Sequence, residues 1–181
     1  GVEWVDWWIA GARVCLMKLE FPHETVGHGD EVCKRRNVKV LLNPSPAADI
    51  PDGGLAATDI LVPNEQEAEA LMGCTPDGDA LKAYCARNGI GRIVMTMGSH
   101  GVWNATRDEA IFYPCKKAVA VDTTGAGDCF LGALAAHLAN GHDIHAAIRF
   151  AMAAPAITVT RAGAPKAMPT FDDVTAAMAK A

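Results

Sequence analysis

The residues from Val121 to Asp128 combine two glycines with a carboxylate at the start of an apolar helical pattern. The apolar stretch Ala118–Val121 before them predicts the order strand, glycine turn and helix. The first backbone N–H groups of a helix lack intrahelical partners, and the helix dipole favours negative charge there. The run therefore predicts a phosphate-binding site, with Gly125, Ala126 and Gly127 as an anion hole.

Asp128 is unusual at such a position, because a carboxylate beside a phosphate repels the ligand. Its physical use is that of a general base, which takes a proton from an attacking hydroxyl while the glycine amides stabilise the developing negative charge. The alternative is an aspartate that only caps the helix. Companion motifs elsewhere in the chain favour the catalytic interpretation.

The elements that must position these residues alternate along the chain. Apolar runs predict buried parallel strands at Ala12–Leu19, Val38–Leu42, Asp59–Val62 and Arg92–Thr96. Helices are predicted at Glu24–Asn37, Asn64–Met72, Asp79–Asn88, Ala126–Asn140, Asp143–Thr160 and Phe171–Ala179. A hairpin is predicted from Gly101–Ala105 and Ala110–Tyr113. The alternation favours an α/β fold with a doubly wound, mostly parallel sheet flanked by helices, and ligands at the carboxyl ends of its strands.

Several motifs occur in a fixed order along the chain. They are Asn43-Pro-Ser-Pro-Ala47, Pro63-Asn-Glu-Gln-Glu-Ala-Glu69, Thr96-Met-Gly-Ser-His-Gly101, Asp122-Thr-Thr-Gly-Ala-Gly-Asp128, Ala147-Ile-Arg-Phe-Ala151 and Val159-Thr-Arg-Ala-Gly-Ala164. Between residues 12 and 170 the chain thereby resembles the ribokinase-like (PfkB) carbohydrate kinases, and ribokinases most of all. The resemblance implies ATP-dependent phosphorylation of a sugar hydroxyl, with D-ribose to D-ribose 5-phosphate as the expected reaction.

The resemblance also implies roles for residues outside the glycine run. The residues expected to bind ATP are Asn64, Thr96, Met97, Gly98, Ser99, His100, Gly101, Gly127 and Met152. Glu20 is expected to bind sugar hydroxyls together with Asp128, although a glutamate at a strand end is also a common structural residue. Taken alone, the stretch Thr96–Gly101 would be read as a tight turn.

The same resemblance implies that two metal ions are bound. Glu67 is expected to act on Mg²⁺ indirectly through water, because Mg²⁺ keeps several of its waters in proteins. The alternative is a plain helix cap, since Asn64 and Glu67 have capping-box spacing. The residues expected around K⁺ are Asp122, Thr124, Thr158, Arg161, Gly163 and Ala167.

Three positions depart from the family pattern. Ala167 stands where a hydroxyl residue often helps to bind K⁺, although main-chain carbonyls there would survive the change. Pro155 lies within the predicted helix before Thr160 and is expected to kink it near the adenine pocket. Met152 stands where a polar contact to adenine is common and offers apolar packing instead.

The length of 181 residues suits a single domain over residues 1–181. The match begins in the middle of the family, so we expect the C-terminal ATP-binding and catalytic portion, with the N-terminal half and lid missing. Such a portion is expected to have little kinase activity alone and to self-associate through an exposed sheet edge. The alternatives are a non-catalytic nucleotide-binding fragment and a related fructose or nucleoside kinase. A Rossmann oxidoreductase is disfavoured, since no G-x-G-x-x-G follows the first strand.

Composition indicates a cytoplasmic enzyme. The net charge of −5 has no block of one sign, and the basic cluster Lys34-Arg35-Arg36 reads as a solvated helix end, so no nucleic-acid surface is expected. No apolar run is long enough to span a membrane. Six cysteines without a C-x-x-C pair predict reduced thiols. Small molecules, the sugar and ATP, are the expected partners, and the resemblance is compatible with a homodimer of the full-length protein.

Overall fold

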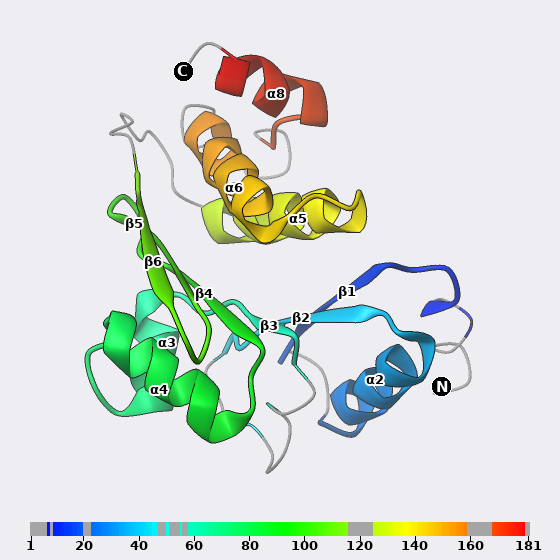
Figure 1. The fold of residues 1–181 in the computed structure, drawn as a ribbon. Helices are drawn as coiled ribbons and strands as arrows, with labels where there is room; N and C mark the ends of the chain where they lie inside the picture. The colour runs from blue at the N-terminus through cyan, green and yellow to red at the C-terminus, as the bar shows by residue number, and fades with distance from the viewer. Residues whose placement is uncertain are drawn as a thin grey trace. The chain divides into compact units, whose positions relative to one another are not determined.

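The computed structural model describes residues 7, 9–19, 23–46, 50, 55, 58–115, 125–158 and 168–179 (Figure 1). The chain divides into two compact units, Gly1–Pro114 and Cys115–Ala181, and each is described by itself. In the part of the chain that the structure describes, no helix has both the length and the apolar character that crossing a bilayer requires.

The first unit is built on one sheet whose strands follow one another in chain order. Its strands are β1 (Val14–Lys18), β2 (Lys39–Asn43), β3 (Ile60–Leu61), β4 (Arg92–Thr96), β5 (Gly101–Ala105) and β6 (Ala110–Pro114). Neighbours from β1 to β4 are parallel, whereas β4, β5 and β6 are antiparallel. The four predicted parallel strands are present, and the predicted hairpin is β5 and β6. The strand predicted at Ala118–Val121 lies outside the described residues.

Strand β3 is much shorter than the predicted range Asp59–Val62, although it lies between two five-residue strands. Hydrogen bonds to β2 continue before and after the two residues of β3. Before β3, the Val40 N–H donates to the Asp59 carboxylate (2.7 Å). After it, the Val62 N–H donates to the Leu42 carbonyl (2.8 Å) and the Asn43 side-chain amide donates to the Val62 carbonyl (2.8 Å). The side chains of Asp59 and Asn43 thus supply hydrogen bonds between the strands where β3 is too short to supply them from its backbone.

Three helices of this unit cover one face of the sheet: α2 (His23–Arg36), α3 (Glu65–Met72) and α4 (Gly78–Asn88). Val40 packs with residues of α2, and Leu42 packs with residues of α3 and α4. Residues two apart on a strand point to the same face, so all three helices lie on that face. Lys34, Arg35 and Arg36 form the exposed last turn of α2, as predicted.

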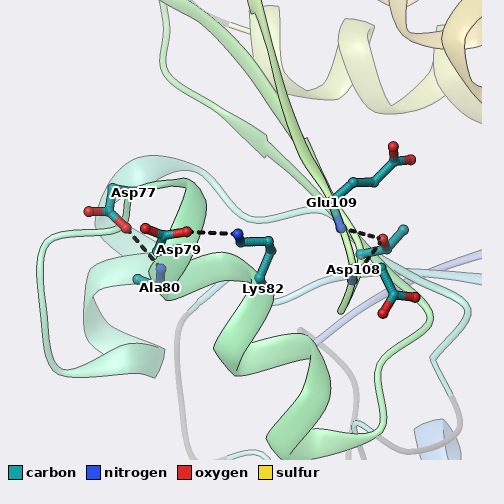
Figure 2. A network of polar contacts seen from close by, with 7 residues as sticks. Asp77, Asp79, Ala80, Lys82, Asp108 and Glu109 are labelled. Atoms are coloured by element: carbon teal, nitrogen blue, oxygen red, sulfur yellow. Dashed lines mark hydrogen bonds and ion pairs between the residues drawn. The ribbon is translucent and has the colours of Figure 1, made fainter.

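Helix α4 begins one residue before the predicted start, because Asp77 caps it: its carboxylate accepts the Ala80 N–H at 2.8 Å (Figure 2). In the first turn, Lys82 lies 2.7 Å from the Asp79 carboxylate. Figure 2 also shows the tight turn between β5 and β6, where the N–H groups of Asp108 and Glu109 donate to the Thr106 hydroxyl. These short-range contacts stabilise the start of α4 and the turn between β5 and β6.

The second unit is helical in its described part, with α5 (Ala126–Ala139), α6 (Ile144–Thr158) and α8 (Phe171–Ala179). Its core includes Cys129 of α5, Phe150 and Ala154 of α6, and Val174 of α8. Pro155 lies inside α6, as predicted. Helix α6 ends two residues before the predicted Thr160, at the boundary of the described residues.

His137, in the last turn of α5, is buried among aromatic rings. Its ring stacks on His142 (3.8 Å between centroids) and on Phe150 (4.4 Å), and its Nδ1 atom has no hydrogen-bond partner among the described residues. Burial lowers the pKa of His137 below its ordinary value of 6.5, and His142 lowers it further, whereas Asp143 raises it. The neutral ring is therefore the form that the folded unit accommodates.

We expect the thermal stability of the protein to fall as the pH drops from about 8 to about 5. A histidine whose folded pKa is depressed stabilises the fold above its unfolded pKa, and this contribution is lost as the pH falls through the folded pKa. His137→Phe keeps an aromatic ring and should remove part of this pH dependence. Calorimetry of both proteins across this range checks the prediction, and identical pH dependence in the two would contradict it.

Candidate functional site

The carboxyl ends of β2, β3 and β4 bring three predicted motifs to one edge of the sheet. Asn43 is the last residue of β2, and Asn64 follows β3 by three residues. Asn64 forms a parallel bridge with Thr96, the last residue of β4, and the Thr96 N–H donates to the Pro63 carbonyl at 3.0 Å. This edge is where ligands bind in open α/β sheets.

Asn64 and Glu67 form the capping box that their spacing predicts. The Asn64 side chain accepts the Glu67 N–H (2.8 Å), and the Glu67 carboxylate accepts the Asn64 N–H (2.9 Å). Only the Oε2 atom of Glu67 takes part in the hydrogen bonds with described residues. Oε1 accepts no hydrogen bond from the described residues, and a half-buried carboxylate with such an oxygen suits a Mg²⁺ ion held through water.

The segment between β4 and β5 is an exposed, tightly turned loop. The Met97 N–H donates to the Gly101 carbonyl (2.9 Å), and the His100 N–H donates to the Met97 carbonyl (3.0 Å). Gly98 has a φ of +52°, which favours glycine, and Gly98, Ser99 and His100 are all exposed. The tight turn considered above is therefore present, and it leaves the polar groups of the loop open to a ligand.

The N-terminus of α5 in the second unit differs from those of α3 and α4. No side chain of the described residues caps it, and its N-cap residue is Gly125, with a φ of +79°. The first intrahelical bond runs from the Cys129 N–H to the Gly125 carbonyl (2.9 Å), so the N–H groups before it point out of the helix. Asp128 lies in this first turn and is exposed, and the space beside Gly127 is open among the described residues. Main-chain donors and a carboxylate thus lie within one helical turn.

The remaining predicted residues are less completely described. Met152 is half-buried in α6, and Thr158 is the last residue of that helix. Glu20 and most of the residues expected around K⁺ lie outside the described residues: Asp122, Thr124, Arg161, Gly163 and Ala167. Asn43 is not among the site residues that the sequence predicts, although it begins one of the motifs named above. The missing signal is a contact with Glu67, which is 24 positions away in the chain.

Three features of the described residues are typical of α/β proteins that bind phosphorylated ligands. They are polar groups at the carboxyl edge of a parallel sheet, an exposed glycine loop, and a helix N-terminus that no described side chain caps. The comparison with known families is more specific. The chain belongs to the pfkB family of carbohydrate kinases, which it matches over residues 8–170.

Individual relatives agree with this assignment. The ribokinase of Bacillus subtilis is 38% identical over 162 residues, which are 88% of this chain and 53% of the relative. The deoxyribokinase of Salmonella typhi is 37% identical over 166 residues, 88% of this chain and 54% of the relative. The chain therefore spans about half the length of these curated relatives.

Solved structures confirm the ribokinase-like α/β fold. The ribokinase from Thermotoga maritima has a TM-score of 0.88 at 34% identity, covering 99% of this chain and 61% of that structure. The Arabidopsis thaliana ribokinase in complex with ribose and ATP has a TM-score of 0.88 at 30% identity, covering 98% and 58%.

Proposed function

We propose that this chain provides the ATP-binding and catalytic part of a sugar kinase, with D-ribose to D-ribose 5-phosphate as the reaction. The observation that carries the proposal is the N-terminus of α5, which lacks a side-chain cap among the described residues and holds Asp128 in its first turn. The names of the relatives support a pentose as substrate, since they are ribokinases and deoxyribokinases.

In the proposed reaction, the Asp128 carboxylate removes the proton of a sugar hydroxyl, and the hydroxyl oxygen attacks the γ-phosphorus of ATP. The bond between this phosphorus and the oxygen bridging to the β-phosphate breaks, so the products are sugar phosphate and ADP. The N–H groups of Gly125, Ala126 and Gly127 hold the oxygens of the transferred group. Positioning and charge stabilisation of this kind supply most of the catalysis in phosphoryl transfer.

The loop Thr96–Gly101, together with Asn64, Gly127 and Met152, is proposed to bind ATP. Glu67 is proposed to hold Mg²⁺ through water, and the ion would neutralise charge on the phosphates. Glu20 is proposed to bind sugar hydroxyls. K⁺ is proposed at the residues named above for it, of which Thr158 is the only one whose backbone the structure describes.

An assay of ADP formation tests the proposal. The longest natural form of the protein is given Mg·ATP with ribose, deoxyribose, fructose or a nucleoside, with and without K⁺. We expect ribose to give the fastest ADP formation and K⁺ to accelerate it. ATP binding without ADP formation from any acceptor would instead favour a non-catalytic nucleotide-binding module.

A further inference from the structure

Asn43 is a buried polar residue, 7% exposed, at the carboxyl end of β2, and the proposed reaction does not yet use it. Its amide nitrogen donates to the Val62 carbonyl at 2.8 Å and lies 3.5 Å from Oε2 of Glu67. We propose that Asn43 is a positioning residue that orients the Glu67 carboxylate toward the magnesium–ATP complex. The inference rests on the proposed function, because that function gives Glu67 its role.

The geometry of the amide explains how Asn43 acts. A side-chain amide has two N–H donors in one plane. The short bond to the Val62 carbonyl fixes this plane, because the carbonyl belongs to the buried main chain of the sheet edge. The second N–H is then turned toward Glu67. At 3.5 Å this contact is at the upper limit of a hydrogen bond, so its effect is on orientation more than on folding.

A second donor acts on the same carboxylate oxygen. The Asn64 N–H lies 2.9 Å from Oε2 of Glu67. With that bond alone, the carboxylate could pivot about Oε2. The Asn43 amide approaches the same atom from another element, so two donors hold Oε2. Oε1, which no described residue contacts through a hydrogen bond, then keeps one direction and can accept from a water of the metal ion.

Another reading is that Asn43 only satisfies the Val62 carbonyl and closes the sheet beside the short strand β3. The two readings differ in one respect. A purely structural Asn43 affects the protein equally whether or not Glu67 carries a charge. A positioning Asn43 matters only while the Glu67 carboxylate is present to be positioned.

A double-mutant cycle of Asn43→Ala and Glu67→Gln separates the readings. The glutamine amide oxygen in Glu67→Gln can still accept the Asn64 N–H, so the capping box survives while the charge is lost. Calorimetry of the longest natural form of the protein, saturated with a non-hydrolysable ATP analogue, measures the dissociation constant of Mg²⁺. We expect Asn43→Ala to raise it about threefold, near the lower end of the range for the loss of one hydrogen bond, because the contact is long. In the Glu67→Gln background Asn43→Ala should change it less than about twofold, within the usual additivity error.

Two controls keep the test interpretable. Asn88→Ala removes a similar side-chain amide bond, from Asn88 to the Tyr84 carbonyl (3.0 Å), at the far end of α4, and should leave Mg²⁺ binding unchanged. If Asn43→Ala does not fold, Asn43→Ser keeps a polar group beside the Val62 carbonyl and is too short to reach Glu67.

The outcomes distinguish this inference from the proposed function. An equal effect of Asn43→Ala in both backgrounds overturns the positioning role and leaves the role of Glu67 intact. An unchanged Mg²⁺ dissociation constant in Glu67→Gln itself overturns the proposed role of Glu67, and the positioning role of Asn43 with it.

Discussion

Asp128→Asn is expected to lower sugar-dependent ADP formation by about two to four orders of magnitude, the usual contribution of general base catalysis. Asparagine has the same shape but cannot accept the proton of the sugar hydroxyl. Because Asp128 is exposed in the first turn of α5, the substitution should leave the fold unchanged. Steady-state turnover of the longest natural form measures the loss, and equilibrium titration should show ATP binding within about twofold of the parent, a difference of less than about 1 kcal/mol.

Asp143→Asn is the matched control. The Asp143 carboxylate accepts the Ala146 N–H at 2.9 Å at the start of the neighbouring helix α6, and asparagine caps helices equally well. This variant should keep normal turnover. Near-normal turnover in Asp128→Asn would show that Asp128 is only an N-terminal helix residue, and the base assignment would be wrong.

Gly101→Ala is expected to destabilise the first unit by about 3 kcal/mol or more, because it combines backbone strain with overpacking. Gly101 has a φ of +146°, a conformation that residues with a Cβ rarely adopt. A Cβ atom there would overlap the Tyr113 carbonyl oxygen and lie 2.8 Å from the Phe112 ring. The strand pairing of β5 with β6 must shift to accept it. Urea denaturation measures the change in the free energy of unfolding.

Gly89→Ala separates the overlap from the backbone term. Gly89 ends α4 with a φ of +68°, and no atom of the described residues lies within 4 Å of the position where a Cβ would be. Its replacement should cost only about 1–2 kcal/mol, the penalty of a left-handed conformation. Equal losses for the two alanine variants would mean that the overlap with Tyr113 is relieved at little cost.

Much of the fold was predictable because its signals are local. The limits of β4 and β5 agree with the predicted Arg92–Thr96 and Gly101–Ala105, since an apolar run ends at a glycine loop. The capping box of Asn64 and Glu67 was also predictable from spacing alone. Both depend on residues close together in the chain, where sequence patterns are most informative.

Other features depend on contacts between distant residues. Strand β3 pairs with β2 and β4 over only two residues, which the apolar run Asp59–Val62 does not reveal. The approach of Asn43 to Glu67 requires β2 and α3 to be placed first. For α5, the sequence predicted a glycine turn, but only the backbone shows that Gly125 itself is the N-cap and that no described side chain caps that end.

The two-residue strand β3 has a consequence for anyone redesigning this protein. Around it, the sheet is held together partly by the side chains of Asp59 and Asn43, and Asn43 also faces Glu67. Substitutions of Asp59 or Asn43 made to alter ligand preference would also remove hydrogen bonds that hold β2 beside β3. Libraries aimed at new specificity are therefore better directed at exposed loop positions such as Ser99 and His100, where no described strand pairing depends on the side chain.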